Sequence, residues 1–294
     1  MLHIDNLGKT YSNGVQALQG VNLNISTGMF GLLGPNGAGK SSLMRTLATL
    51  QDPDQGRATF AGIDVVENKN QLRRQLGYLP QYFGVYPKIS PAEMLNHLAV
   101  LKGIRGARER KALVRHLLEQ VNLWQVRHKA LDTFSGGMKQ RFGIAQALIG
   151  NPRLIIVDEP TAGLDPKERK RFHDLLSELS EEAVVILSTH IVDDVADLCA
   201  NMAIMGNGKI LKQGDTDTVI GEMADCVWRC QVDKQQMPRL AAEHDVIRSH
   251  LCRGKVEVHV RSAVSPGTEF TPIPGDLEDV YFAILKANNI DNEA

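Results

Sequence analysis

The segment that most constrains the fold is GPNGAGKS, residues 34–41. It follows the apolar run MFGLL, which has the character of a buried strand. It precedes SSLMRTLATL, in which Leu43, Leu47 and Leu50 recur at helical spacing. A glycine-rich turn between a strand and a helix, ending in Lys-Ser, is typical of a loop that binds phosphate groups. We therefore expect an α/β fold with this loop at the carboxyl end of a sheet strand.

The chemistry expected of this loop follows from its residue types. Glycine lets backbone N–H groups approach phosphate oxygens without a Cβ in the way, and the start of the next helix adds its positive end. Lys40 can reach the β- and γ-phosphates, and the Ser41 hydroxyl can bind Mg²⁺. The alternative is a glycine-rich turn with an ordinary surface lysine. The residues expected to contact a nucleotide are Gly34, Pro35, Asn36, Gly37, Ala38, Gly39, Lys40, Ser41 and Ser42.

Two carboxylates follow another apolar strand, in LIIVDEP at residues 154–160. Asp158 lies at the carboxyl end of this strand, where it can hold Mg²⁺ through water. Glu159 lies one step further, where a base could polarise the water that attacks the γ-phosphate. His190 ends a third apolar run, VVILSTH, and is expected beside both carboxylates if the two strands are neighbours. The alternatives are a solvated turn for the carboxylates and a structural role for the histidine.

A second candidate anion site lies far from the first, in FSGGMKQR at residues 134–141. Ser135, Gly136 and Gly137 are expected to cap a helix, which would present a hydroxyl, free N–H groups and a positive dipole end. An ordinary glycine-rich helix start is the alternative. Gln81 in YLPQ and Asp165 in GLDP carry little information by themselves, and either could be a plain loop residue.

Apolar strands that alternate with amphipathic helices predict a mostly parallel central sheet covered on both faces. Residues 1–28 read as short strands of an antiparallel β subdomain. Residues 90–150 read as a helical subdomain inserted between the halves of the sheet, and SPAE, which starts at Ser90, has the pattern of a helix N-cap. We expect a nucleotide-binding domain over residues 1–215. Residues 216–294 change character and are expected to form a small accessory α+β domain.

The composition limits the class of partner. Thirty-three basic residues against 34 acidic residues leave a formal charge of −1, so nothing global attracts the chain to nucleic acid. The strongest apolar runs, LIIV and AVVIL, are far shorter than the roughly 20 residues of a membrane-spanning helix. A membrane process would therefore need another polypeptide. The four cysteines fit no zinc spacing and indicate reduced thiols in a cytosolic protein.

Taken in order, the motifs resemble those of the ATP-binding cassette (ABC) ATPases over roughly residues 1–215. The motifs that carry the resemblance are Gly34–Ser41, Gln81, Ser135–Gly137, Leu154–Glu159, Asp165 and His190. The resemblance implies ATP and Mg²⁺ as ligands, with Tyr11 stacked on adenine, although Tyr11 alone could equally be a core residue. It also implies that Gln81 senses Mg²⁺ and the γ-phosphate, and that Asp165 lies at a subunit contact. The implied catalytic residues are Lys40, Gln81, Glu159 and His190, and the implied metal-binding residues are Ser41, Gln81 and Asp158.

In this family two copies pair head to tail. The resemblance therefore implies a homodimer or heterodimer in which each ATP lies between the phosphate loop of one subunit and Ser135–Gly137 of the other. This chain departs from the family pattern at two positions: Phe134 replaces the usual leucine, and Met138 stands where many members have glutamine. Neither change removes the groups that would face phosphate, so an active ATPase is expected. Methionine at position 138 cannot make the hydrogen bonds of a glutamine amide, which could alter ATP affinity or the rate of closure.

The leading hypothesis is an ATP-hydrolysing subunit, bound peripherally on the cytoplasmic face of the membrane, that drives a separate polytopic permease. The motifs are most similar to those of bacterial export ATPases for drugs, antibiotics, peptides or lipids. Residues 81–90 are expected to receive the permease. Phe83 and Tyr86 could be exposed contacts there, or could pack under the helical subdomain. The alternative function is a soluble ABC factor that remodels ribosomes or DNA, but the two cassettes or long coiled-coil insertion usual in that class are not visible.

Overall fold

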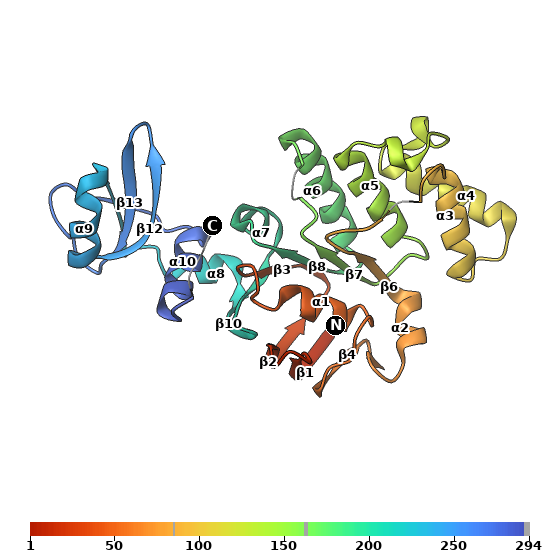
Figure 1. Cartoon of the computed structure of the whole chain (residues 1–294), viewed down its shortest axis with the longest axis horizontal. Helices are drawn as coiled ribbons and strands as arrows, with labels where there is room; N and C mark the ends of the chain where they lie inside the picture. Colours follow the sequence, from red (N-terminus) through yellow and green to blue (C-terminus); the bar gives the residue numbers. More distant parts are fainter. Residues whose placement is uncertain (85, 162–163, 291–294) are drawn as a thin grey trace.

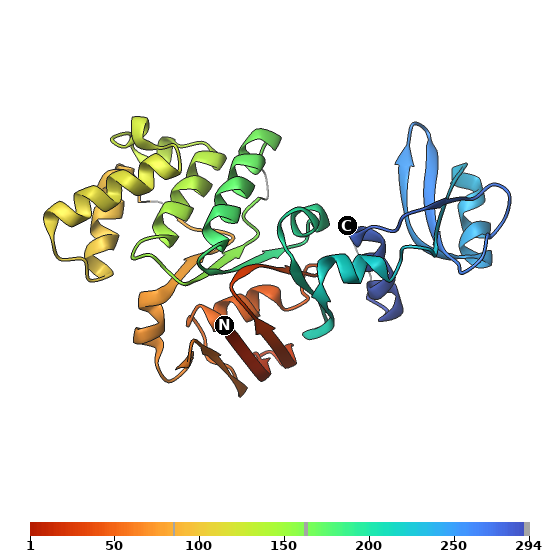
Figure 2. The same cartoon turned by 180° about the vertical axis from the view of Figure 1, so that it is seen from behind.

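The structure is a computed structural model that describes residues 1–84, 86–161 and 164–290. Two sheets lie side by side in the middle of the molecule, with helix α1 (Lys40–Leu47) between them (Figure 1). Helices α3 (Pro91–Leu101) and α4 (Ala107–Gln120) lie at one end. A third sheet lies at the opposite end, as the view from behind also shows (Figure 2).

The N-terminal sheet is antiparallel, with the strand order β2-β1-β4-β5. Leu2 and Ile4 point into the core that includes α1, while the alternate residues His3 and Asp5 are exposed, as expected for a sheet with one solvated face. The two opening strands are longer than the short strands predicted from residues 1–28. The strands are β1 (Leu2–Thr10), β2 (Gln16–Ile25), β4 (Gln55–Phe60) and β5 (Ile63–Asp64).

The central sheet has the order β10-β9-β3-β8-β7-β6, and all its pairs are parallel except the hairpin β9-β10. The strands β7 and β8 are buried along their whole length, as the continuous apolar runs predicted. The mostly parallel α/β fold expected from the sequence is therefore confirmed. The strands are β3 (Gly28–Leu33), β6 (Leu76–Leu79), β7 (Leu154–Asp158), β8 (Val184–Thr189), β9 (Asn201–Gly206) and β10 (Lys209–Asp215).

Helices cover both faces of the central sheet. Along β7, Leu154 and Ile156 belong to the core cluster that contains α1, whereas Ile155 and Val157 belong to the cluster on the other face. That second cluster includes residues of α6 (Pro166–Ser180) and α7 (Val192–Leu198). In the part of the chain that the structure describes, no helix combines the length and apolar character needed to span a bilayer.

The helical subdomain consists of α3, α4 and α5 (Gly136–Ala147), with α2 (Lys69–Gln75) preceding it. The predicted N-cap at Ser90 is confirmed: Ser90 and Glu93 form a reciprocal capping box, and Pro91 occupies the first turn. Short 3-10 turns at Trp124–Val126 and Leu131–Thr133 lead from α4 to α5. Phe134, which stands where the family usually has leucine, is buried in the core of this subdomain.

In segment 81–90, the two aromatic residues Phe83 and Tyr86 lie in different environments. Phe83 is half-buried and packs against the hydrophobic core, so close to Gly143 that a Cβ at that glycine would lie 2.7 Å from the Phe83 ring. Tyr86 is exposed, and so is Tyr82. Phe83 therefore packs under the helical subdomain, and the exposed aromatic residues are the two tyrosines. Position 85 of this segment lies outside the described residues.

The C-terminal part contains an antiparallel sheet of order β12-β13-β11-β14. A small core of its own, built around Val258, Val260 and Phe270, holds this sheet together. The elements are α8 (Thr216–Gly221), β11 (Val227–Val232), α9 (Met237–Glu243), β12 (Asp245–Cys252), β13 (Lys255–Arg261), β14 (Thr271–Ile273) and α10 (Leu277–Ala287).

The closing helix α10 returns to the part of the chain that contains the central sheet. Its Tyr281 is buried in the same core cluster as Val195 of α7. On its other side, the fully buried Asp279 accepts hydrogen bonds from Arg248 Nε at 2.8 Å and from His259 Nδ1 at 2.7 Å. Helix α10 thus joins the C-terminal sheet to α7, through an apolar contact on one side and a buried ion cluster on the other.

Candidate functional site

The phosphate-loop motif connects β3 to α1, and its glycines are required by packing as well as by ligand access. A Cβ added at Gly34 would lie 2.4 Å from the Met205 carbonyl oxygen of β9. Gly39 has φ +106°, and a Cβ there would lie 2.3 Å from the carbonyl oxygen of Ala17. Both contacts are with backbone, which cannot move aside easily. The loop therefore lies tightly between the two central sheets and presents its other side to solvent.

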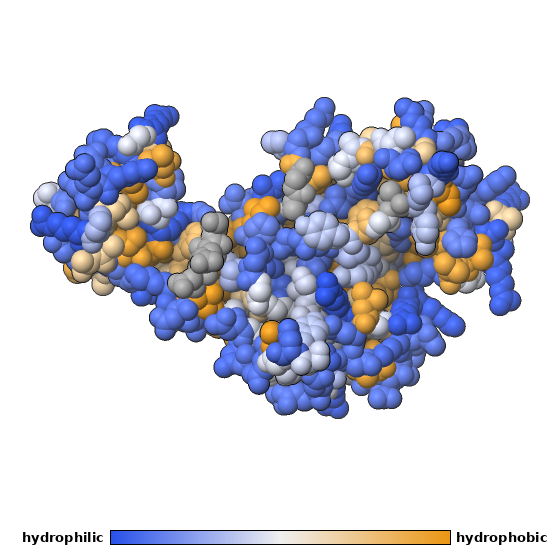
Figure 3. All heavy atoms as spheres, in the orientation of Figure 1, coloured by the Kyte–Doolittle hydropathy of each residue, from blue (hydrophilic) through white to orange (hydrophobic). Residues whose placement is uncertain are grey.

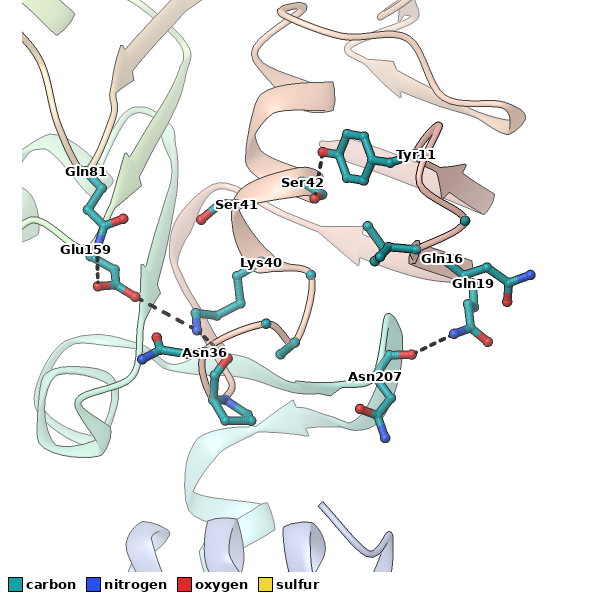
Figure 4. Close-up of a pocket in the computed structure, with 17 residues that line it drawn as sticks. Tyr11, Gln16, Gln19, Asn36, Lys40, Ser41, Ser42, Gln81, Glu159 and Asn207 are labelled. Carbon is teal, nitrogen blue, oxygen red and sulfur yellow. Dashed lines mark hydrogen bonds and ion pairs between the residues drawn. The ribbon is translucent and has the colours of Figure 1, made fainter. Parts of the chain in front are cut away.

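That other side is the floor of a cleft of about 720 Å³. Tyr11 and Gln16, around the β1-β2 turn, line one wall together with Asn207 from the β9-β10 turn. Gln81 and Glu159 line the opposite wall (Figure 4). The volume falls in the range of small-molecule sites, roughly 300–1,000 Å³. The cleft is thus polar at its phosphate-loop end and extends away from that end toward an aromatic side chain.

Lys40 is almost fully buried in the floor of this cleft. Its ammonium group donates hydrogen bonds to the carbonyl oxygens of Gly34 and Pro35 and lies 4.0 Å from Glu159 Oε1. Burial lowers the pKa of Lys40, while the charges of Glu159 and Asp158 act in the opposite direction. The lysine is therefore held over its own loop, where an added anion would favour its charged form.

Glu159 stands at the carboxyl end of β7 with φ +48°, a left-handed conformation that costs of order 1–3 kcal/mol for a residue with a side chain. Its N–H donates to the Ser188 carbonyl oxygen at 2.8 Å. Its carboxylate accepts a hydrogen bond from Gln81 Nε2 at 2.8 Å and lies 3.3 Å from His190 Nδ1. Glu159, His190 and Gln81, which are far apart in the sequence, thus converge at one point, as Figure 4 shows for Glu159 and Gln81.

Asp158 precedes Glu159 and is also buried. Burial raises the pKa of Asp158, and the nearby hydroxyls of Ser188 and Ser41 partly offset that effect. Among the described residues, neither Asp158 Oδ1 nor the Ser188 hydroxyl finds a hydrogen-bond partner. A buried carboxylate oxygen without a partner, beside the Ser41 hydroxyl, is the donor set that Mg²⁺ prefers. The residues present therefore fit the Mg²⁺ ion that the sequence implied.

Tyr11 lies at the far end of the cleft from Glu159 (Figure 4). Its hydroxyl bonds to Ser42 Oγ at 3.0 Å and donates to Gln51 Oε1 at 3.1 Å, so the ring is anchored on α1 and the residues that follow it. The wall beside it was not anticipated from the sequence: Gln19 Nε2 donates to the Asn207 carbonyl oxygen at 3.0 Å. Pattern alone could not find this pair, because Gln19 is one polar residue within β2 and Asn207 is an ordinary turn residue.

The residues of the second predicted anion site do not line this cleft in the described part of the chain. Ser135 is exposed at the start of α5 and caps it, since its hydroxyl accepts a hydrogen bond from Met138 N at 3.3 Å. Gly137 lies against Glu168 of α6. Asp165 is the N-cap of that same helix, and its carboxylate accepts from Glu168 N at 2.9 Å. The predicted subunit-contact residues therefore gather at the neighbouring starts of α5 and α6.

Comparison with known proteins agrees with the motifs. Residues 18–162 match the family described as ABC transporter. The probable multidrug ABC transporter ATP-binding protein YbhF of Escherichia coli (strain K12) is 39% identical over 194 residues, which cover 66% of this chain and 33% of YbhF. The chain thus spans only a third of the length of that relative. The daunorubicin/doxorubicin resistance ATP-binding protein DrrA of Streptomyces peucetius is 35% identical over 232 residues, covering 78% of this chain and 70% of DrrA.

Two further likenesses extend the comparison. The methionine import ATP-binding protein MetN of Bordetella pertussis is 32% identical over 276 residues, covering 91% of this chain and 75% of MetN. A solved dimeric post-hydrolysis state of the ATP-binding cassette MJ0796, bound to ADP and Pi, has a TM-score of 0.67 at 27% identity and covers 73% of this chain and 98% of its own. The family expected from the motifs is confirmed, and this chain belongs to the ABC transporter family as an ATP-binding cassette ATPase.

Proposed function

We propose that this chain is the ATP-binding and ATP-hydrolysing subunit of an ABC transporter, and that two such subunits close around two ATP molecules. The observation that carries the proposal is the convergence of three side chains on one space beside the phosphate loop. Lys40 follows β3, Glu159 follows β7 and His190 follows β8, and these strands are neighbours in the order β3-β8-β7. Ligands of open α/β sheets bind at the carboxyl ends of the strands, where these residues lie.

Each side chain has a role that its contacts support. Lys40 would balance the charge of the β- and γ-phosphates, and Glu159 would take a proton from the attacking water. His190, 3.3 Å from the Glu159 carboxylate, would hold that carboxylate in place and contact the γ-phosphate. Mg²⁺, when bound by Ser41, Asp158 and the phosphates, would stabilise the charge that develops on the phosphate oxygens. The Gln81 amide oxygen, which points toward Ser41 in Figure 4, would face that ion.

A single chain supplies only one side of this site. Ser135 and the N–H groups at the start of α5 are exposed outside the cleft, where the phosphate loop of a second copy could meet them. Asp165, exposed at the start of α6, would lie in the same contact. A homodimer or a heterodimer with a close relative would complete both sites. The dimeric form of the MJ0796 cassette supports this arrangement.

A groove between the central sheet and the helical subdomain is suited to a helix of a permease. It is lined by Leu50, Leu98 and Leu101, with Arg73 and Lys102 among its basic residues. Leu50 and Leu101 are 62% and 70% exposed, and Figure 3 shows apolar surface around the end of α3, where Leu101 lies. An amphipathic helix with acidic residues beside its apolar face would fit this lining. The exposed Tyr82 and Tyr86 of segment 81–90 add a second candidate contact.

The transport direction that we propose is export. It rests on the names of the relatives YbhF and DrrA, which are a probable multidrug transporter subunit and a drug-resistance subunit. MetN, a methionine import subunit, is the competing likeness. In either direction the subunit would sit on the cytoplasmic face of the membrane, where ATP is available, and the permease would select the substrate.

Affinity purification of this chain from gently solubilised membranes tests the proposal. We expect a polytopic membrane protein to co-purify with it, and we expect Leu101→Asp to lose that partner. Leu251→Asp is the matched control, because Leu251 is 61% exposed but lies on the C-terminal sheet. Repeated recovery with ribosomes or DNA in place of a membrane protein would contradict the transporter assignment.

A further inference from the structure

A buried carboxylate outside the cleft connects the elements that carry the catalytic residues. Asp194 of α7 has no exposed surface. Its Oδ2 accepts a hydrogen bond from the Thr161 hydroxyl at 2.6 Å. Its Oδ1 accepts a hydrogen bond from Arg169 Nε at 2.8 Å and lies 2.7 Å from both Arg169 Nη2 and His173 Nε2. One side chain therefore joins the segment after β7, the helix α6 and the helix α7.

This cluster has the features of a device that sets position. Burying a carboxylate is costly unless partners replace the lost water, and a buried ion pair is weak evidence for a gain in stability. Asp194 nevertheless has both oxygens occupied by donors from two other segments. Such a group fixes the relative placement of those segments, because moving any one of them would take at least one hydrogen-bond partner from a buried charge.

Thr161 lies in the turn after β7, which contains the strained backbone of Glu159. Glu159, two residues earlier, has a left-handed backbone that persists only where the surroundings determine it. The turn is held at three points by three different elements. The Ser188 carbonyl of β8 accepts from Glu159 N, Gln140 of α5 donates to the Pro160 carbonyl oxygen at 3.1 Å, and Asp194 of α7 accepts from Thr161.

The same carboxylate also lies close in sequence to His190. Asp194 is in the first turn of α7, which begins just after the strand end that carries His190. A bond from Asp194 to Thr161 therefore ties the segment that carries His190 to the segment that carries Glu159. The side chains of those two residues lie 3.3 Å apart, and this separation depends on how the two segments are placed.

We propose that Asp194 is a positioning residue for ATP hydrolysis: through Thr161 it holds Glu159 in its left-handed conformation against His190. Asp194 lies outside the lining of the nucleotide cleft, so it acts on turnover without binding ATP. The inference rests on the proposed role of Glu159 as the base, and the variants below separate the two claims.

The decisive comparison is Thr161→Val against Thr161→Ser in the full chain. Valine keeps the shape of threonine but removes the hydroxyl, whereas serine keeps the hydroxyl. We expect Thr161→Val to lower kcat for Mg-ATP about 10- to 100-fold, the order of loss that a small misplacement of a catalytic group causes. ATP affinity should stay unchanged, because the phosphate loop is untouched. Thr161→Ser should retain most of the turnover. All rates are measured well below the melting temperatures of the wild type and of both variants, so that unfolding does not contribute.

Asp194→Asn completes the design. If Asp194 acts through Thr161, the double variant Asp194→Asn/Thr161→Val should turn over no more slowly than the slower single variant. A Thr161→Val protein with kcat within twofold of wild type would overturn the inference, and so would equal losses in the valine and serine variants. Normal turnover in Thr161→Val, together with loss of turnover in Glu159→Gln, would refute the positioning role of Asp194 and leave the role of Glu159 as base intact. Normal turnover in Glu159→Gln would refute the proposed base itself.

Discussion

Replacing Glu159 by glutamine isolates the chemistry of one atom from the structure around it. The two side chains have nearly the same shape, and Gln81 Nε2 can still donate to an oxygen at position 159, as it does now at 2.8 Å. What the variant loses is the negative charge and the ability to accept a proton from water. A positioned base contributes about 10²–10⁴ in rate. At 1.36 kcal/mol per factor of ten, the barrier should rise by about 3–5 kcal/mol.

The same change should not weaken ATP binding. The Glu159 carboxylate lies 4.0 Å from Lys40 Nζ, at the place where a γ-phosphate would bring further negative charge. Removing the carboxylate removes a like-charge repulsion with that phosphate, so Glu159→Gln should bind Mg-ATP at least as tightly as wild type. Because hydrolysis is blocked while the nucleotide remains bound, the variant should accumulate a closed dimer.

Two assays test this expectation. Phosphate release at saturating Mg-ATP measures kcat, and size-exclusion chromatography with light scattering measures the oligomeric state. Glu182→Gln is the matched control, because Glu182 is exposed just before β8 and should leave both readings unchanged. A Glu159→Gln protein that keeps more than about a tenth of the wild-type kcat would refute the assignment of the base. One that stays monomeric in saturating Mg-ATP would refute the shared site.

Three other variants test other parts of the structure. Lys40→Ala should abolish ATP binding, measured with labelled nucleotide, with an unchanged melting temperature excluding unfolding as the cause. Ser135→Arg should abolish hydrolysis but spare ATP binding to the isolated subunit; loss of both would place this serine in the subunit's own cleft. Asp279→Asn should lower the free energy of unfolding by about 1–3 kcal/mol in a denaturant titration, since His259 and Arg248 would lose a charged acceptor while Arg248 keeps Asp276 and Glu278. Burial opposes a low pKa for Asp279, but His259 and Arg248 outweigh it and the pKa is lowered. Wild-type stability should therefore be complete above the unfolded pKa of about 3.9 and fall as the pH drops below it, and the variant should lack this part of the acid dependence.

Local features of this protein could be predicted because their information is contiguous. The phosphate loop is eight consecutive residues between a strand and a helix. The capping box at Ser90 needs only the three residues that follow it. Four consecutive apolar residues predict the strand β7, which ends at Asp158. In each case the information lies within a short segment: its own side chains cap the backbone N–H groups, or its own apolar pattern or glycines set the backbone conformation. The residue types therefore nearly determine the local structure.

The Asp194 cluster shows where such reasoning stops. Asp194 is one of three acidic residues in VDDVADL, and acidic side chains are mostly exposed in proteins. Asp193 and Asp197 are indeed exposed, whereas Asp194 is completely buried. Its partners Thr161 and Arg169 lie 33 and 25 residues away in the sequence, and nothing in the spacing of residues links them. Phe83 was open to two interpretations for the same reason: an aromatic residue in a loop can pack inward or outward.

By itself, the sequence determined which residues have the chemistry to bind phosphate, Mg²⁺ and water, and which helices and strands carry them. Only the tertiary structure decided that Glu159, His190 and Gln81 meet at one point, and that α10 returns to pack on α7. The physical reason is that any strand can satisfy its backbone hydrogen bonds with many neighbours. The order β3-β8-β7 is chosen by packing both faces of the sheet at once, a property of the whole chain rather than of any segment.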